Sequence, residues 1–290
     1  MPRSSPAASV LLPIALLVVA MVSIQSGASL AKSLFPLIGA EGTTALRLGL
    51  AAVILSLVMR PWRARLTLQS CRSLLAYGLA LGSMNLLFYM SLKTIPLGVA
   101  VALEFTGPLA LALLSSRRAL DFLWVVLAVF GIWLLLPDQA ADTRLDPQGM
   151  GLALGAGVCW ALYIIFGQKA GAQHGSYTAA LGTLVAALLV FPIGVWQTAG
   201  GLFAAELLPV ALAVALMSSA LPYSLEMIAL TRLPARTFST LMSMEPAIAA
   251  LSGLLFLGEQ LALNQWLAIG AIILASAGAA ATIRPQGKLL

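Results

Sequence analysis

Long apolar runs separated by short polar connections make up most of the chain. A helix needs about 20 apolar residues to cross a bilayer, whereas a transmembrane barrel would show short segments of alternating hydrophobicity. We therefore expect an all-α protein with ten transmembrane helices. The runs are Val10–Ala31, Thr44–Met59, Ser73–Ser91, Leu97–Leu114, Phe122–Leu136, Gly149–Phe166, Tyr177–Trp196, Leu207–Leu230, Ala235–Leu257 and Asn264–Ile283.

The composition points to the same class of protein. Of the 290 residues, 61% are apolar and 9% are charged, and the mean hydropathy is +1.00. A soluble domain carries about 25% charged residues, so this chain could not cover a surface that faces water. An ordinary soluble enzyme, a disordered chain and a disulfide scaffold are excluded, and a polytopic membrane protein remains.

Lysine and arginine are distributed unevenly over the connections. With a cytoplasmic N-terminus, ten spans place 12 of the 16 Lys and Arg residues in cytoplasmic segments and 4 on the opposite side. This bias agrees with the positive-inside rule and predicts a multi-pass protein with both termini in the cytoplasm. The net charge of +6 is spread over these short loops, which argues against nucleic-acid binding.

A pattern of prolines and acidic residues occurs twice in the chain. Pro108 lies twelve positions after Pro96, and Pro246 lies twelve positions after Pro234, with an acidic residue just before the second proline of each pair. With 15 prolines, one matched pair could arise by chance, but the matched acids favour a repeat. Since each unit contains five spans, an odd number, the second unit enters the membrane from the opposite side. The pattern predicts two inverted five-helix repeats, residues 9–137 and 148–284, as in many secondary transporters.

Several segments resemble the EamA-type carriers of the drug/metabolite transporter superfamily. This resemblance is carried by Met244–Ala250 (MEPAIAA), Leu257–Gln260 (LGEQ) and Trp266–Gly270. Other segments are similar to the threonine/homoserine exporters of bacterial inner membranes, and the similarity covers almost the whole chain. They are Ser23–Gln25, Gly27–Pro36, Ala102–Ala110 and Ala220–Pro234.

The resemblance implies a ten-helix fold of two inverted five-helix units around a central cavity. It also implies export of small amino acids (threonine, homoserine and analogues) across the inner membrane by proton antiport with alternating access. The partners would be the amino acid, protons and membrane lipid, without nucleic acid or a cofactor, and the resemblance leaves a homodimer open. The alternative is an exporter of another small metabolite or drug in the same superfamily.

Three carboxylates lie within the predicted spans: Glu104, Glu226 and Glu245. A charge in hydrocarbon costs about 2.5–3.5 kcal/mol on insertion scales, so each group needs water, a partner or a proton. Each could hold the ammonium group of a substrate or carry a proton, which makes them candidate substrate-binding and proton-binding residues. The alternative is a buried acid that only joins two helices.

Other polar side chains recur at helical spacing and are candidates to line the cavity. Asn, Gln and Tyr could donate to a substrate carboxylate, although Tyr and Trp also mark membrane interfaces and amides also join helices. The candidates are Gln25, Asn85, Tyr89, Trp160, Tyr163 and Tyr223.

Two prolines and three cations within or near the spans each allow two interpretations. Pro108 and Pro246 would bend their helices, and Pro108 would free the carbonyl of Glu104. The bent helices would either line the cavity or only pack against their neighbours. Lys32, Arg47 and Lys93 lie near the outer ends of their predicted spans and are interpreted as anchors at the membrane surface or as collectors of a substrate carboxylate.

Two other classes of protein make different demands on the sequence. An intramembrane enzyme would need paired aspartates, a Ser/His pair or a zinc helix, but the confident spans hold no Asp and the chain has a single histidine. We therefore expect no enzyme activity and no metal. A structural or regulatory membrane protein without flux would gain no stability from any amino acid.

Overall fold

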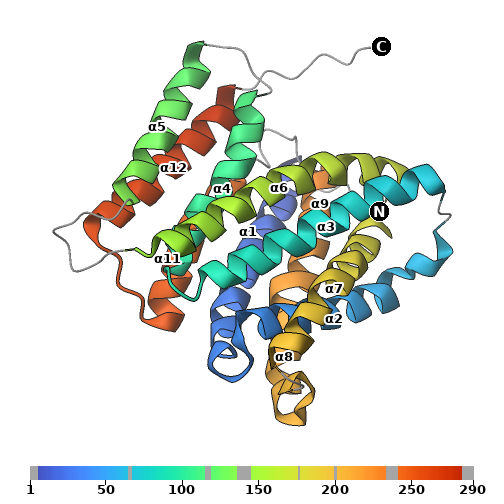
Figure 1. Cartoon of the computed structure of the whole chain (residues 1–290). Coiled ribbons are helices and arrows are strands. Elements are labelled where there is room, and N and C mark those ends of the chain that lie inside the picture. The colour runs from blue at the N-terminus through green and yellow to red at the C-terminus, as the bar shows by residue number, and fades with distance from the viewer. Residues whose placement is uncertain are drawn as a thin grey trace.

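The computed structural model describes residues 6–64, 67–114, 119–135, 145–175, 177–198, 201–232 and 241–282, and in these ranges it contains helices and turns but no strand. Helices distant in sequence pack beside one another (Figure 1). They are α1 (Pro6–Lys32), α2 (Phe35–Met59), α3 (Leu68–Ser91), α4 (Leu97–Leu114), α5 (Ala119–Leu135), α6 (Pro147–His174), α7 (Tyr177–Thr198), α8 (Leu208–Ala215), α9 (Leu221–Arg232), α11 (Glu245–Leu257) and α12 (Leu263–Thr282). The shorter turns are η1 (Pro61–Arg63), η2 (Gly201–Phe203), η3 (Ala205–Leu207) and the π-helical η4 (Leu216–Ala220).

Ten apolar helical segments within the described ranges fit the ten predicted spans. Six are long and apolar enough to cross a membrane, and the shorter apolar helices are α4, α5, α11 and α12. Because α8, η4 and α9 follow one another without a gap, they form a single segment, the eighth. The predicted all-helical class agrees with this arrangement.

Helix capping explains where α3 and α6 begin. The Thr67 side chain accepts a hydrogen bond from the backbone of Ser70, and the Asp146 carboxylate accepts from the backbone of Gly149 at 3.0 Å. Hydrogen bonds from Thr94 and from the backbone of Gly149 hold the pKa of the Asp146 carboxyl below its usual range. Asp146 therefore links the α3–α4 connection to the start of α6.

The second helix begins at Phe35, whereas the sequence predicts a start at Thr44. Pro36 stands in its first turn, where the missing N–H costs no hydrogen bond, and Gly39 then interrupts the helix with a φ of 67°. The polar stretch that suggested a loop is buried inside the helix, and the hydroxyl of Thr44 donates back to the carbonyl of Ala40 at 2.7 Å. Residues near Thr44 therefore lie well inside the helix and not at its start.

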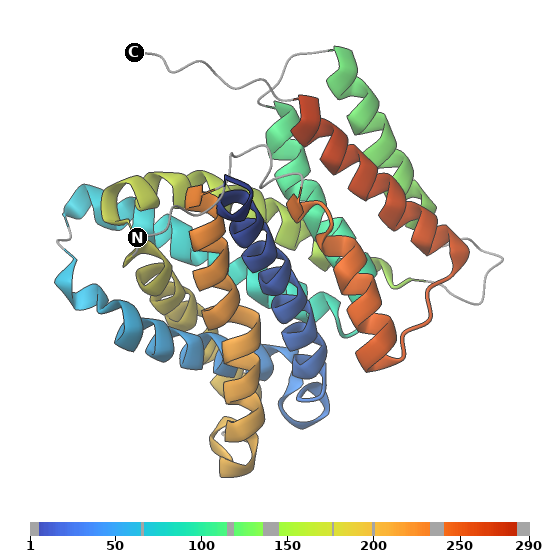
Figure 2. The ribbon, with the colours of Figure 1, turned by 180° about the vertical axis from the view of Figure 1, so that it is seen from behind.

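Figures 1 and 2 show that helices from the two halves of the chain are interleaved. α2 packs along α7, α3 along α6, and α5 along α12. α4 contacts both α6 and α11, while α1 lies against η4, α9 and α11. The helices α1, α4 and α11 therefore meet in the interior, where the candidate site lies.

Two glycines let α4 and α6 approach closely. A Cβ on Gly157 would lie 2.6 Å from the carbonyl oxygen of Glu104, and a Cβ on Gly107 would overlap the backbone of Gly157. Pro108 cannot donate the usual helical hydrogen bond to that same Glu104 carbonyl. The carbonyl therefore faces the backbone of α6, which satisfies the rule that irregular backbone at membrane depth is buried in protein.

Pro246 stands at a different place in its helix from Pro108, which lies inside α4. It stands in the first turn of α11, directly after a turn at Ser243 and Met244, and not inside a continuous helix. A proline in the first turn of a helix removes no helical hydrogen bond, and the interruption at Ser243 and Met244 lies directly before it, where a proline bends or ends a helix. The predicted role of Pro246 as a kink therefore stays a prediction. The change of direction comes earlier, at the turn, and places Glu245 at the start of α11.

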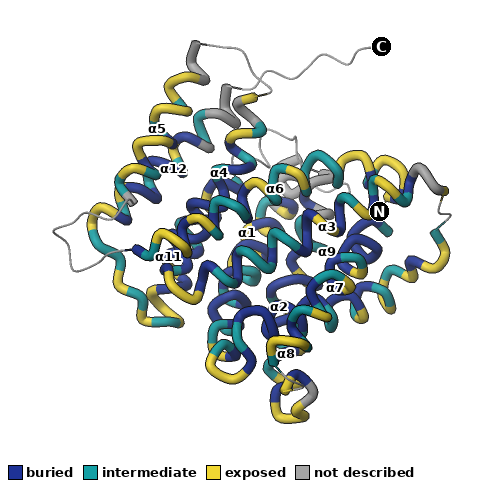
Figure 3. Tube along the Cα trace, viewed as in Figure 1, coloured by how far each residue is buried: buried dark blue, intermediate teal, exposed yellow. Residues whose placement is uncertain are grey.

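The outward faces of the helices are apolar, and Figure 3 shows exposed positions recurring along α5. Exposed side chains of this helix include Phe122, Val126, Val129 and Trp133. Contiguous apolar surface of this kind is unfavourable in water and suits contact with lipid tails.

Gly157→Ala is expected to destabilise the protein by about 1–3 kcal/mol, because the new methyl group forces α4 and α6 apart. Gly151→Ala, on the same helix, is the matched control, since a Cβ there meets nothing within 4 Å. Thermal unfolding of the purified protein in detergent compares the two variants. Equal melting temperatures for both would contradict the close α4–α6 contact.

Candidate functional site

A cavity of about 80 Å³ lies in the interior, between helices of both halves of the chain. The structure brings all the side chains predicted to bind substrate or protons together around it. These are Gln25, Asn85, Tyr89, Glu104, Trp160, Tyr163, Tyr223, Glu226 and Glu245. Their roles in transport remain predictions. The cavity is also lined by Ile24, Ala28, Arg47, Leu81, Met84, Phe88 and Met242.

Two of the carboxylates are almost inaccessible. Glu104 on α4 is 7% exposed and Glu245 at the start of α11 is 4% exposed. The amide Nε2 of Gln25, on α1, donates to Glu245 Oε1 at 2.9 Å. Glu245 Oε2 and Gln25 Oε1 have no hydrogen-bond partner among the described residues. The site therefore contains hydrogen-bond acceptors that are buried and unused.

Arg47 is predicted from the sequence to lie near the outer end of its span, as an anchor at the membrane surface or a collector of a substrate carboxylate, and the structure corrects that position. It lies three turns into α2, is 2% exposed and lines the cavity. Its Nη1 donates to the Ser218 carbonyl at 3.1 Å and to Ser219 Oγ at 2.9 Å, and its Nη2 donates to Asn85 Oδ1. Its guanidinium carbon lies 4.6 Å from the centre of the Tyr89 ring, a cation–π contact.

One feature of the sequence could have located this arginine. The Phe35-Pro36 pair is a helix-start signal, and a helix counted from it carries position 47 well inside the membrane. The partners of Arg47, in contrast, carry no sequence signal. Ser218 and Ser219 belong to the π-helical η4, whose wider turn is a feature often found at functional sites.

Aromatic contacts fix the rings that line the cavity. Trp160 packs edge-on against Phe105 with ring centres 5.4 Å apart, and Tyr163 packs against Tyr77 at 4.9 Å. Tyr89 is nearly inaccessible, although its hydroxyl has no partner among the described residues. These rings therefore belong to the interior, whereas interface markers would lie at the membrane surface.

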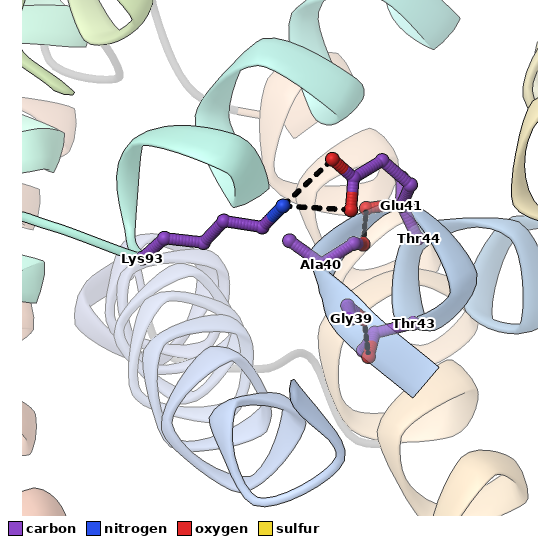
Figure 4. A network of polar contacts seen from close by, with 6 residues as sticks. All are labelled: Gly39, Ala40, Glu41, Thr43, Thr44 and Lys93. Atoms are coloured by element: carbon purple, nitrogen blue, oxygen red, sulfur yellow. Dashed lines mark hydrogen bonds and ion pairs between the residues drawn. The ribbon is translucent and has the colours of Figure 1, made fainter. Parts of the chain in front are cut away.

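Two ion pairs lie at the end of the molecule where α1 ends. Lys32 Nζ lies 2.6 Å from Glu259 Oε1, and Glu259 Oε2 accepts from the backbone N–H of Leu97 at 2.8 Å. Figure 4 shows Lys93 reaching both oxygens of Glu41, at 2.7 and 2.8 Å. Lys32 and Lys93, predicted to be anchors or collectors of a carboxylate, are thus paired within the protein.

An apolar cluster covers the opposite side of the cavity. Leu17 and Met21 lie two turns and one turn before Gln25 on α1, and they pack with Phe105, Ala229 and Met242. The cavity therefore lies between a layer of ion pairs and a layer of apolar side chains. Among the described residues, no group of three or more His, Cys, Asp or Glu side chains is arranged to hold a metal ion.

The Lys32–Glu259 pair is expected to contribute more to stability than the Lys93–Glu41 pair. The side chains of the first pair are 22% and 14% exposed, whereas Lys93 is 41% exposed, so solvent screens the second pair more. Double-mutant cycles with alanine should give coupling energies of about 1–2 kcal/mol for the first pair and below about 1 kcal/mol for the second. A larger coupling energy for Lys93–Glu41 than for Lys32–Glu259 would contradict this ranking of the two ion pairs.

Comparisons with known proteins agree with this geometry. Residues 147–280 match the model of the EamA-like transporter family. Two relatives named "Threonine/homoserine exporter RhtA", from Escherichia coli (strain K12) and Salmonella typhimurium (strain LT2), are each 60% identical over 100% of this chain and 98% of their own length. A solved structure described only as "Crystal structure of protein" aligns with a TM-score of 0.61 at 18% identity, covering 95% of this chain and 97% of that chain, and supports the fold.

The similarity extends over the whole chain, and the apolar helices are those of a multi-pass membrane protein. A full-length identity of 60% shows that this chain and these relatives belong to one family. The chain belongs to the EamA-like transporter family.

Proposed function

We propose that this protein is a secondary transporter of a bacterial inner membrane that exports threonine, homoserine and analogues in exchange for protons. Four charged side chains around one buried cavity carry this proposal: Arg47, Glu104, Glu226 and Glu245. Buried charges of this kind are costly at membrane depth and mark substrate and ion pathways. The substrate follows from the names of the relatives that are 60% identical over the full chain.

The charge balance of the cavity supports coupling to protons. Three carboxylates and one guanidinium line it, so the fully ionised set carries an excess of two negative charges, three minus one. A low-dielectric interior makes such an excess unfavourable, and protons are the simplest way to neutralise it when the cavity is empty. A carboxylate that carries a proton cannot pair with an ammonium group. Proton and substrate would therefore exclude each other, which is the basis of antiport.

The size of the cavity favours a small solute. Its volume is about 80 Å³, whereas pockets for drug-sized ligands measure roughly 300–1,000 Å³. A short polar amino acid needs much less space than a drug. We therefore favour amino-acid export over drug export within this family.

Alternating access requires two units that move against each other, and we propose residues 9–137 and 148–284 as inverted repeats. α2 packs on α7, α4 on α11 and α5 on α12, which are equivalent helices in the two units. The contact of α3 with α6 has its counterpart in the contact of α1 with η4 and α9. A two-fold axis in the membrane plane would produce such paired contacts. The bias of Lys and Arg supports an orientation with both termini in the cytoplasm.

Glu245→Gln and Glu104→Gln should each lower threonine efflux at least about tenfold, because an amide can neither carry the proton nor pair fully with an ammonium group. Glu206→Gln is the matched control, since Glu206 is exposed in η3, outside the cavity. Efflux of labelled threonine from proteoliposomes, with and without an imposed pH gradient, measures the effect at equal protein content.

The outcomes of this experiment separate the parts of the proposal. Full-rate efflux in both cavity variants would refute the roles of the carboxylates. Wild-type efflux that ignores the pH gradient would refute proton coupling. Counterflow with threonine, homoserine, other small metabolites and a cationic drug tests the substrate, and exchange of the drug alone would refute the amino-acid assignment.

A further inference from the structure

Unused hydrogen-bonding atoms are concentrated in the cavity. Within the described residues, five buried side-chain atoms have no hydrogen-bond partner. Four of them belong to cavity-lining residues: Gln25 Oε1, Glu245 Oε2, Arg47 Nε and Tyr89 Oη. A buried polar atom without a partner costs free energy, so a cluster of them in one cavity indicates a ligand that supplies the missing bonds.

The four atoms divide by chemistry into two pairs. Gln25 Oε1 and Glu245 Oε2 accept hydrogen bonds, and their side chains are joined by the 2.9 Å bond from Gln25 Nε2 to Glu245 Oε1. Arg47 Nε–H and the Tyr89 hydroxyl donate, and the Arg47 guanidinium packs over the Tyr89 ring at 4.6 Å. Gln25 and Glu245 therefore form an acceptor site that contains a carboxylate. Arg47 and Tyr89 form a donor site that contains a cation.

We infer that Arg47 and Tyr89 form a carboxylate subsite and that Glu245 and Gln25 form an ammonium subsite in the same cavity, so that the cavity selects a zwitterion. This inference rests on the proposed function and names the groups that recognise the substrate. The guanidinium N–H and the phenol O–H donate to the two carboxylate oxygens, and the ammonium group donates to Glu245 and Gln25. An α-amino acid carries both groups on one carbon, a short span that suits a small cavity.

The position of Arg47 is held by the protein and not by the substrate. Its Nη1 is bound to Ser218 and Ser219, and its Nη2 is bound to Asn85. These bonds come from η4 and α3, so the side chain is fixed before a ligand arrives and its Nε–H remains free. A fixed donor of this kind binds an anion without further loss of side-chain entropy.

The test measures selectivity with two analogues of threonine. Threoninol replaces the carboxylate by an alcohol, and 2,3-dihydroxybutanoate replaces the ammonium group by a hydroxyl. Competition against labelled threonine on the reconstituted full-length protein gives the affinity of each compound. The wild type should bind threonine at least about tenfold more tightly than either analogue.

Each variant should remove the preference for one of the two charged groups of threonine, either the carboxylate or the ammonium group. Arg47→Gln should bring the affinity for threonine down to that for threoninol while the preference over 2,3-dihydroxybutanoate remains. Glu245→Gln should bring the affinity for threonine down to that for 2,3-dihydroxybutanoate while the preference over threoninol remains. Tyr89→Phe should weaken threonine about tenfold and leave threoninol unchanged, and since the Tyr89 hydroxyl has no partner, its removal leaves no buried group unpaired. Tyr177→Phe, at the start of α7 and outside the cavity lining, is the matched control.

The outcomes distinguish this inference from the proposed function. A wild type that binds threonine, together with Arg47 and Tyr89 variants that weaken threonine and threoninol equally, would overturn the carboxylate subsite. A wild type that binds threoninol as tightly as threonine would overturn it as well. A wild type that neither binds nor transports any amino acid would instead refute the proposed function. If Arg47→Gln does not fold, Tyr89→Phe decides, because it keeps the ring and removes only a hydroxyl that has no partner among the described residues.

Discussion

A charged side chain at membrane depth needs a partner, a proton or water, and the interior of this protein is organised by that requirement. The buried Arg47 donates hydrogen bonds to η4 and α3, and Glu245 accepts a hydrogen bond from α1. These bonds join helices from both halves of the chain. The polar centre therefore holds the helices in place and leaves some of its own atoms unpaired, which a passive structural core would avoid.

Close backbone packing makes room for this centre without exposing polar groups to lipid. Gly107 and Gly157 bring α4 against α6, and the carbonyl that Pro108 cannot bond is covered by the α6 backbone. The π-helical η4 offers the carbonyl of Ser218 and the hydroxyl of Ser219 to Arg47. Each of these irregular features is thus buried in protein, as irregular backbone within a bilayer must be.

The two ends of the cavity are covered by different kinds of interaction. Ion pairs and a hydrogen bond to the Leu97 backbone join the connections on one side, and the Leu17–Met21 face of α1 packs into an apolar cluster on the other. In the proposed alternating-access mechanism each cover would open in turn. The ion pairs are partly exposed, and solvent screening keeps such pairs weak, which is compatible with opening on that side.

The hydrophobic pattern by itself determined the helical class and the ten segments, because a bilayer imposes a length and an apolar composition on every span. The sequence also indicated the three glutamates, since an ionisable residue inside an apolar run has few explanations. Only the tertiary structure decided that Arg47 belongs to the same cavity and that Pro246 begins a helix. The reason is physical: the depth of a residue depends on where its helix starts and on which neighbours supply its hydrogen bonds. Those neighbours come from other helices, as Asn85 and Ser218 do for Arg47, and Ser218 lies more than a hundred positions away.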